Sequence, residues 1–431
     1  MKKLPAILSD LRFGRTFGPV LLSLLPVLCV AAGERNLSAG DVEIPVHVVE
    51  AQQRRALVLW LPSEHGVQEG QRRVAETLAG FGIETWLADP FEAWLLPAGE
   101  SGLMQLQPKA LARAIQRVAE VAGVPVVVAS HDRGSVLALE ALRLWQIDHP
   151  GDARVRGALL ITPNLALRTP EPGQPARLTP AIRSTNLPLF LIQPELSTTA
   201  LRLPEWLDAL AEGGARVYWR GVPGARDRFF FRPDASSVEQ ERAASLADWM
   251  AQGVLRLLRE PLPARAAEAA AAETASAPPR RSGLVEFEGS PWPPSLALAG
   301  LDGSKYDLAA LRGKVVLVNF WASWCPPCVH EMPSMQRLWA DWHGRGFDVL
   351  AVNLGEQASA TQAFAHRHGL VFPILLDPAR QAAKAWSVYA YPTSYILDRQ
   401  GRIRLAVAGG IDWGAPEVRA RIQSLIEERG L

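Results

Sequence analysis

The stretch Asn319–Glu331 reads NFWASWCPPCVHE, and it places Cys325 and Cys328 two residues apart. The apolar run at 314–322, KVVLVNFWA, overlaps its start and is typical of a strand buried on both faces. The residues that follow, 326–346, predict a helix that ends at glycine. The cysteine pair is therefore expected where a buried strand gives way to the N-terminus of a helix.

This position determines what each thiol can do. A helix N-terminus offers free N–H groups and a partial positive charge, which lower the pKa of Cys325 and make it the nucleophile. Cys328, one turn further on, is expected to face inward and to resolve a mixed disulfide. Pro326 and Pro327 suit the first helical turn, where a missing N–H donor costs little.

The cysteine count favours redox chemistry over the alternatives. The chain has three cysteines, and Cys29 lies in the apolar N-terminal segment. A zinc site needs about four ligands, and no second cysteine pair follows Cys325 and Cys328. A structural disulfide that closes so short a loop restrains little of the unfolded chain. A redox pair in an oxidising compartment is the interpretation that we adopt, with no metal or cofactor expected.

The N-terminus predicts export. Lysines and arginines precede an apolar segment at 17–32, and small residues stand before a polar start at Gly33. We read 1–32 as a cleaved signal peptide that leads to the periplasm or the extracytoplasmic face of the membrane. The alternative is a retained membrane anchor, because the run is close to the lower limit of a spanning helix.

Length and composition indicate two globular domains. The 431 residues carry a net charge of +1 and 48% hydrophobic residues, and no basic stripe that would suggest nucleic acid binding is visible. The segment 259–283 is rich in alanine and proline and predicts a linker. It separates 41–258 from 284–431, and both segments have ordinary domain sizes.

The C-terminal half alternates strand and helix patterns, which indicates an α/β fold with a central sheet flanked by helices. Beyond the cysteines, the strand patterns lie at 347–355, 372–377 and, as a hairpin, 393–409. Helices are expected at 359–369, opened by a serine cap, and at 379–388 and 415–430.

Together, FWASWCPPC and YPTSYILD resemble the thioredoxin superfamily, and more narrowly its TlpA/ResA-like branch, over 284–431. The resemblance implies that Pro392 is cis and packs across from the disulfide; the alternative is an ordinary trans turn proline. It also implies that Trp324 borders the motif and shapes a docking surface, where the alternative is simple packing.

Two further residues tune the chemistry. Many thioredoxins carry a buried aspartate where this sequence has Asn319, so that proton acceptor is missing. Glu331 matches an acidic residue that the ResA branch uses near its active site, and one helical turn places it close to Cys328. The alternative for Glu331 is a solvated helix glutamate.

The direction of electron flow does not follow from the spacing. Pro-Pro between the cysteines occurs in reducing members of this branch, which implies a reductant kept reduced by a membrane thiol donor of the DsbD/CcdA type. Its implied clients are protein disulfides, for example in cytochrome c maturation or metal-site assembly.

The N-terminal half also alternates strands and helices and resembles an α/β-hydrolase fold, with a parallel sheet and right-handed crossovers. Between the strand and the helix predicted within 124–146, the nucleophile-elbow position reads Ser130-His131-Asp132-Arg133-Gly134. Aspartate at its centre resembles the variant whose carboxylate attacks carbon, so Asp132 is a candidate nucleophile. Ser130 remains a second candidate.

The histidine base that a hydrolase needs late in this domain is missing from the sequence, which offers Arg226 and Asp227 after the last strand. Glu195 could fill the acid position, and His65 lies where such folds build an oxyanion hole. Three hypotheses follow. The chain is a thiol-disulfide oxidoreductase with a non-catalytic binding domain, a hydrolase with a redox appendage, or a non-catalytic scaffold.

Overall fold

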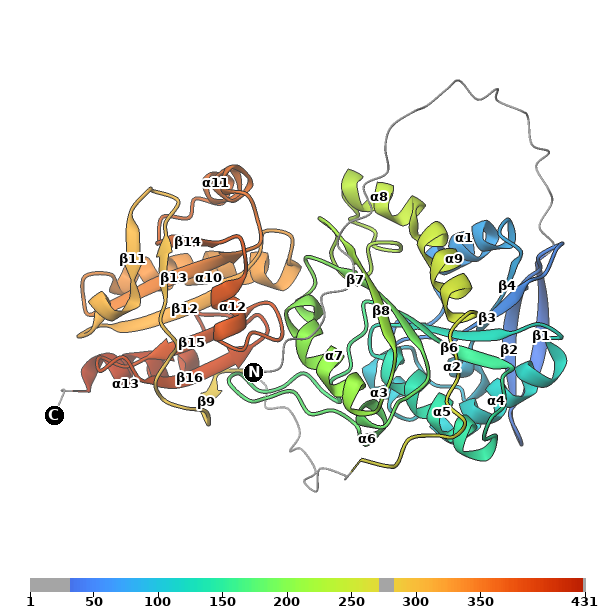
Figure 1. Ribbon diagram of the computed structural model, residues 1–431. Coiled ribbons are helices and arrows are strands. Elements are labelled where there is room, and N and C mark those ends of the chain that lie inside the picture. Colours follow the sequence, from blue (N-terminus) through green and yellow to red (C-terminus); the bar gives the residue numbers. More distant parts are fainter. Residues whose placement is uncertain (1–31, 271–282, 429–431) are drawn as a thin grey trace, which may run out of the picture.

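The computed structural model describes residues 32–270 and 283–428 and contains two large sheets, one in each half of the chain (Figure 1). The predicted export segment up to residue 31, with Cys29, lies outside the described residues, as do 271–282 of the predicted linker. Within the described ranges, no helix is both long enough and apolar enough to cross a bilayer.

The first sheet has eight strands in the order β1-β2-β4-β3-β5-β6-β7-β8. The strands are β1 Ala32–Ser38, β2 Glu43–Val49, β3 Ala56–Trp60, β4 Ile83–Ala88, β5 Val126–His131, β6 Val155–Ile161, β7 Leu189–Pro194 and β8 Val217–Val222. Strands β3 to β8 run parallel, whereas β1 pairs antiparallel with β2 and β2 pairs antiparallel with β4. The expectation of a parallel sheet was therefore wrong at this edge. Strand β1 could not be recognised from the sequence, because AGERNLS contains no apolar run.

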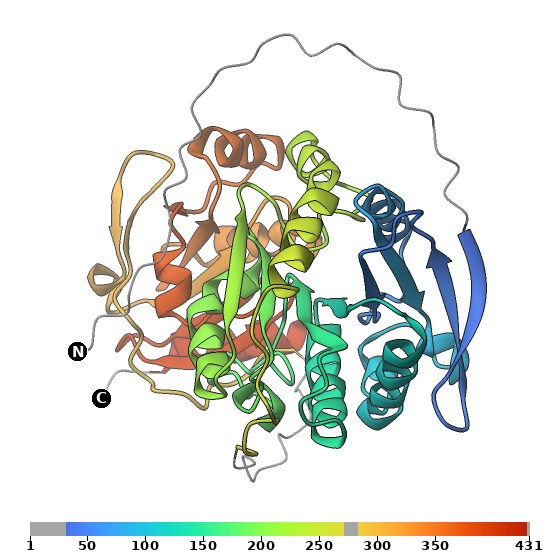
Figure 2. The same cartoon turned by 45° about the vertical axis from the view of Figure 1, so that its right-hand side comes forward.

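Helices cover both faces of this sheet (Figures 1 and 2). The longer ones are α1 Glu69–Ala79, α4 Pro108–Val121, α5 Gly134–Asp148, α7 Leu203–Glu212, α8 Ser237–Ala244 and α9 Leu246–Leu257. Short ones are α2 Pro90–Ala93, α3 Glu100–Leu103, α6 Pro180–Arg183 and the 3-10 turn Thr198–Arg202. Alternate residues of each strand enter opposite cores: Leu57 and Leu59 pack with α4 and α5, while Val58 and Trp60 pack with α1 and α9.

The second sheet has six strands in the order β14-β13-β12-β15-β16-β9. The strands are β9 Val285–Glu286, β12 Val315–Trp321, β13 Phe347–Leu354, β14 Ile374–Asp377, β15 Thr393–Leu397 and β16 Ile403–Ala408. Strand β12, buried at every position, lies parallel to β13 and antiparallel to β15. A small separate hairpin joins β10 Ala297–Ala299 to β11 Lys305–Asp307, and a 3-10 turn follows at Leu308–Leu311.

The helices of the second half are α10 Pro326–Trp342, α11 Ala358–Arg367, α12 Gln381–Ala385 and α13 Pro416–Glu427. Helix α10 continues through Pro333. Helix α11 begins after Gln357 and has no side-chain cap, so the predicted serine cap was wrong: the helix starts one residue before Ser359. The hairpin of β15 and β16 forms as the sequence predicted.

The described part of the predicted linker is bound to the first half. The Arg143 guanidinium donates to the carbonyl of Ala267, Asn186 donates to the carbonyl of Arg265, and the amide of Ala270 donates to the Ser184 hydroxyl. Residues 259–270 therefore lie against the first half without forming a helix.

Candidate functional site

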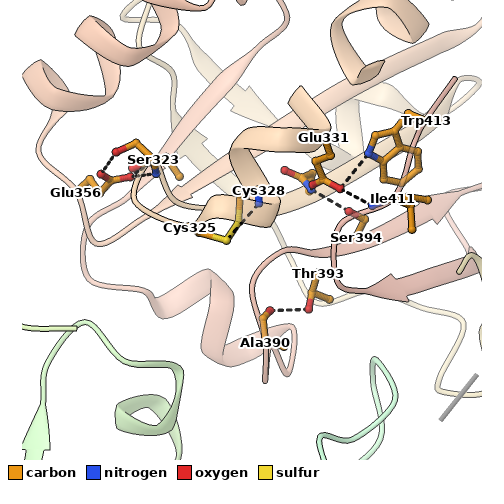
Figure 3. The surroundings of a disulfide bond; sticks show 12 residues. Ser323, Cys325, Cys328, Glu331, Glu356, Ala390, Thr393, Ser394, Ile411 and Trp413 are labelled. Carbon is orange, nitrogen blue, oxygen red and sulfur yellow. Dashed lines mark hydrogen bonds between the residues drawn. A yellow bond between two sulfur atoms is a disulfide. The ribbon is translucent and has the colours of Figure 1, made fainter. Parts of the chain in front are cut away.

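The cysteine pair lies at the junction of β12 and α10 and forms a disulfide (Figure 3). Cys325 is the N-cap residue of α10, and the amide of Cys328 donates to its sulfur at 3.3 Å. Cys325 is 4% exposed and Cys328 is fully buried. This is the arrangement expected of an attacking cysteine and a resolving cysteine, because only Cys325 is partly exposed to solvent and lies at the free N–H groups of the helix N-terminus.

Pro392 lies at the same end of the sheet. The Tyr391–Pro392 peptide bond is cis, as the resemblance implied, and the next residue, Thr393, pairs with Phe320 near the end of β12. Trp324, immediately before Cys325, packs edge-on against Tyr391 with ring centroids 5.7 Å apart. An aromatic pair therefore flanks the disulfide, with the cis-proline directly after it.

The carboxyl group of Glu331 is buried behind the disulfide, with 1% of the residue exposed. Asn319 donates to its Oε1 at 2.8 Å, while the amide of Ile411 and the indole N–H of Trp413 donate to its Oε2 at 3.3 and 3.2 Å (Figure 3). Burial raises the pKa of Glu331 to about 8, and these three donors only partly offset that effect. The interpretation of Glu331 as a solvated helix residue was wrong.

Asn319 has a role that the sequence did not suggest. Its side chain is fully buried in β12, and its amide nitrogen also donates to the Ser394 hydroxyl at 2.9 Å. The residue that replaces an aspartate thus supplies no proton acceptor of its own. It orients the carboxyl of Glu331 instead.

Glu356, which the sequence reasoning missed, holds the turn before the cysteines. Its carboxylate accepts from the amide of Ser323 at 2.7 Å and from the Ser323 hydroxyl at 2.5 Å. Asn353 donates to the same carboxylate at 2.6 Å. The available signal was its place just after β13, the strand beside β12, because parallel strands end at the same edge of a sheet.

Comparison with known proteins agrees with this geometry. The AhpC/TSA family model matches residues 292–406. The thiol-disulfide oxidoreductase ResA of Geobacillus thermodenitrificans is 39% identical over 116 residues, which are 27% of this chain and 67% of the relative. The chain belongs to the ResA family of thiol-disulfide oxidoreductases. ResA of Bacillus subtilis is 35% identical over 116 residues, or 27% of this chain and 65% of its own.

A solved structure from Chlorobium tepidum, described as a putative thiol:disulfide interchange protein DsbE, is 31% identical to the chain. It aligns with 32% of this chain and 96% of its own length, with a TM-score of 0.30. We call the part of the chain from residue 284 onward the ResA-like domain, and it is thioredoxin-like.

A second strand-to-helix junction, between β5 and α5, lies outside the ResA-like domain and carries Asp132. This residue has φ of 47°, a left-handed conformation that is uncommon for aspartate and costs about 1 kcal/mol or more. Position 134, two residues further on, requires glycine, because a Cβ atom there would lie 2.3 Å from the carbonyl oxygen of Pro62. The sharp turn expected of a nucleophile elbow is therefore present.

The Asp132 side chain lies among other ionisable groups. Nε2 of His65 is 3.7 Å from its Oδ2 and 4.0 Å from Oε1 of Glu64. Burial, with help from the charges of Glu64 and Asp227, raises the pKa of Asp132 well above its ordinary value. Burial lowers the pKa of His65 to about 4. The imidazole of His65 is therefore neutral at neutral pH, and the surroundings of Asp132 favour the uncharged form of its carboxyl group.

The other candidates near the elbow are structural. Ser130 is fully buried within β5. His131 is buried as well, and its ring nitrogens lie 2.8 Å from the Ser63 hydroxyl and 3.4 Å from the Trp60 indole nitrogen, which donates to it. Burial lowers the pKa of His131 to about 3, so its ring stays neutral.

Ion pairs stabilise the loop after β8, which is where a hydrolase would carry its base. The Arg226 guanidinium binds the carboxylate of Glu239 and, at 3.1 Å, that of Asp234. Glu195, after β7, is exposed and accepts from the amide of Gly224 at 3.2 Å, so it orients no base. Among residues 32–270 and 283–428, no cluster of three or more metal-ligating side chains occurs.

Proposed function

We propose that the chain is an extracytoplasmic oxidoreductase whose Cys325 and Cys328 act as a dithiol that reduces protein disulfides. The observation that carries this proposal is a nearly buried N-cap cysteine with a buried carboxyl group one turn beyond its partner. The Cys325 thiolate attacks a client disulfide, forms a mixed disulfide and releases one client thiolate, which takes up a proton.

In the second step, the Cys328 thiol gives its proton to the ionised form of Glu331 and attacks the sulfur of Cys325. The second client sulfur leaves as a thiolate and takes up a proton, two electrons have passed to the client, and the Cys325–Cys328 disulfide remains. A pKa of about 8 for Glu331 lies close to the ordinary thiol value of about 8.5. Proton transfer between two groups of similar pKa needs little driving force, which suits Glu331 to this exchange.

The electrostatics of the pair support the reducing direction. Strong oxidants of this class owe their potential to a stabilised reduced form, which means a stabilised thiolate. Here Glu331 is held by uncharged donors, and its negative charge when ionised would disfavour a thiolate at the neighbouring Cys328. Burial of both sulfurs disfavours the thiolate further. The helix N-terminus acts in the opposite direction.

The remaining parts of the proposal rest on the resemblance. Clients would be disulfides of apocytochromes or of proteins that assemble metal sites, and a membrane thiol donor of the DsbD/CcdA type would return electrons. The apolar segment within 1–32 supports export to the periplasm, with or without a retained anchor.

The test is the reduction potential of the Cys325–Cys328 pair, measured on the full chain equilibrated in graded thiol buffers. Thioredoxin has a potential of about −270 mV and a strong periplasmic oxidant about −120 mV. A value toward the thioredoxin end supports a reductant. A value toward the oxidant end would reverse the assignment to a disulfide donor.

For the first half we propose an α/β-hydrolase-like fold that serves binding. The supports are the strand order 1-2-4-3-5-6-7-8, with β2 antiparallel to its neighbours, and the left-handed Asp132 between β5 and α5. One observation favours a working hydrolase, namely the 3.7 Å between His65 and Asp132. A raised pKa at Asp132 opposes it, because a neutral carboxyl is a poor nucleophile.

A panel of ester, epoxide and haloalkane substrates tests the hydrolase. We expect no turnover above that of the Asp132→Asn variant. Turnover that is lost in this variant would restore the hydrolase function.

A further inference from the structure

Loops of the first half contact the ResA-like domain on the side that carries the disulfide. They are the loops that follow β6, β7 and β8. These strands are parallel, so all three loops project from the edge of the first sheet at which the carboxyl ends of its parallel strands lie. In Figure 1 this edge faces the second half, with α7 beside α12, and Figure 3 shows green ribbon of the first half below the loop that carries Ala390 and Thr393.

The central contact involves Arg202 and Tyr389. The Arg202 guanidinium carbon lies 3.4 Å from the centroid of the Tyr389 ring, within the range of a strong cation–π contact. The Tyr389 hydroxyl also accepts from the amide of Ala176 at 3.1 Å. Tyr389 lies three residues before the cis-proline, so the first half binds the segment that leads into the proposed docking surface.

Other contacts extend this interface. Arg380 donates to the carbonyl of Ser197 at 3.2 Å, and Leu201 packs in the hydrophobic cluster that is otherwise formed by the second half. Closest to the disulfide, the Arg226 guanidinium carbon lies 5.7 Å from the ring centroid of Trp324. Trp324 immediately precedes Cys325, so the first half reaches the residue next to the reactive cysteine.

The contact leaves polar atoms unsatisfied. The indole N–H of Trp324 is buried and has no hydrogen-bond partner among the described residues, and the same holds for Nε and Nη2 of Arg202. Arg202 is 5% exposed, and its Nη1 pairs with Glu205 at 2.7 Å. A buried donor without a partner offsets part of the stabilisation that the surrounding contacts provide. Opening would return these donors to water, so the net stability of the closed state is smaller than its contacts alone suggest.

We propose that the first half is an intramolecular cover that occupies the client-docking surface around Trp324 and Tyr389 and that a protein client must displace. The proposal rests on the proposed function, because it assigns a client to that surface. A client that reaches the sulfur has to exchange the loops after β6, β7 and β8 for its own backbone and side chains.

The cover can be tested without a client. The full chain is reduced, and the rate at which Cys325 reacts with a maleimide that carries a polyethylene glycol chain is measured. Cys328 is fully buried, and a Cys325→Ser variant gives the background rate. We expect Arg202→Ala to react about tenfold faster than the wild type, because a desolvated cation–π contact is lost. Arg380→Gly should also react faster, because the hydrogen bond from Arg380 to the carbonyl of Ser197 is lost. Glycine is chosen because it tolerates the φ of 54° at that position.

The matched control is Arg256→Ala. It removes a second cation–π pair of the first half, in which Arg256 lies 4.2 Å from the Tyr218 ring, remote from the cysteines in sequence and with both partners in the first half. Its rate should equal that of the wild type. Equal rates for the wild type, Arg202→Ala and Arg380→Gly would overturn the cover.

Reduction of insulin by the same proteins separates this proposal from the proposed function. Faster labelling and faster insulin reduction in the two interface variants support both. Faster labelling with no insulin reduction by any variant supports the intramolecular cover but contradicts the proposed function as a reductant of protein disulfides. Insulin reduction at the same rate in all these proteins, with unchanged labelling rates, supports the proposed reductant and contradicts the intramolecular cover.

Discussion

The molecule contains two strand-to-helix junctions that place a potential nucleophile at the carboxyl end of a buried strand. At one, β12 ends and Cys325 caps α10; at the other, β5 ends and Asp132 precedes α5. Both helices offer free N–H groups at this point. The surroundings differ. A buried carboxyl group with a pKa raised to about 8 lies behind the cysteine pair, whereas the aspartate is buried among other acids and next to a histidine that stays neutral.

The difference shows that the turn alone does not make a catalytic site. The turn at Asp132 has the strained backbone that a nucleophile elbow would need, but Arg226, bound to Glu239, follows β8 where a hydrolase would carry its base. At Cys325 the chemistry needs only a second thiol and an acid, and the chain supplies both within seven residues.

The largest effect is expected from Cys325→Ser. Without the attacking thiolate no mixed disulfide can form, so thiol–disulfide exchange should fall to the background rate. The measurement is reduction of a peptide disulfide by the pre-reduced full chain. Asp132→Asn, the equivalent change at the other junction, should leave the rate unchanged. A parallel loss in Asp132→Asn would contradict the separation of the two sites.

Glu331→Gln should slow the resolving step by about 100-fold, because the Cys328 thiol loses its proton acceptor. The geometry can adapt, since Oδ1 of Asn319 has no partner among the described residues and an amide flip would let it accept from the new side chain. Rapid-mixing experiments should therefore show the mixed disulfide accumulating after a normal first step. A resolving rate that keeps its wild-type value would remove Glu331 from the mechanism.

The same substitution should change how stability depends on pH. The folded pKa of Glu331, about 8, lies above its ordinary value of 4.5, so the folded state binds the proton more tightly. The wild type should then lose stability as pH rises from about 4.5 to 8, by roughly 4 kcal/mol in all. Guanidinium titrations at successive pH values should show the two proteins equally stable near pH 4, with the variant progressively more stable up to pH 8. A constant difference would contradict the raised pKa.

A smaller effect is expected from Glu356→Gln. The Ser323 amide and the Asn353 side chain both donate to Oε2, so the single oxygen of an amide can keep these two bonds, but the bond from the Ser323 hydroxyl to Oε1 and the negative charge are lost. The turn before Cys325 would loosen, and exchange should slow about three- to tenfold without loss of the disulfide. Glu427→Gln, at an exposed helix position, is the control. An unchanged rate would show that Ser323 needs no such support.

The smallest effect is expected at the other junction. Because the pKa of Asp132 is raised, folding at neutral pH disfavours its charged form, and Asp132→Asn removes that cost. The melting temperature of the variant should exceed that of the wild type at pH 7 and match it near pH 3. A lower melting temperature at pH 7 would mean that the carboxylate is ionised in the folded protein and could act as a nucleophile after all.

The sequence predicted the parts of the fold that local patterns encode. The continuous apolar run before Cys325 gave the buried strand β12, and the turn at residues 399–401 gave the last hairpin. Strand β1 escaped prediction because it is a polar edge strand with one buried residue among those described. An edge strand pairs through its backbone, and its side chains need no apolar pattern.

At the site, the sequence predicted roles for Cys325 and Cys328 from their spacing and for Glu331 from the family resemblance. Burial of Glu331 could not be inferred, since helix periodicity alone does not reveal what packs above a position. The roles of Asn319 and Glu356 depend on which strands lie side by side and therefore needed the three-dimensional structure.

The carboxyl of Glu331 is held by residues that the ribosome supplies at very different times. Asn319 precedes it by 12 positions, whereas Ile411 and Trp413 follow it by 80 and 82. A chain synthesised from its N-terminus thus carries both cysteines long before it can bury the acid between them and the last turn of the domain. Until Ile411 and Trp413 have been added and packed, Glu331 lacks two of its three hydrogen-bond donors. The surroundings of this carboxyl group are therefore complete only when nearly the whole domain has folded.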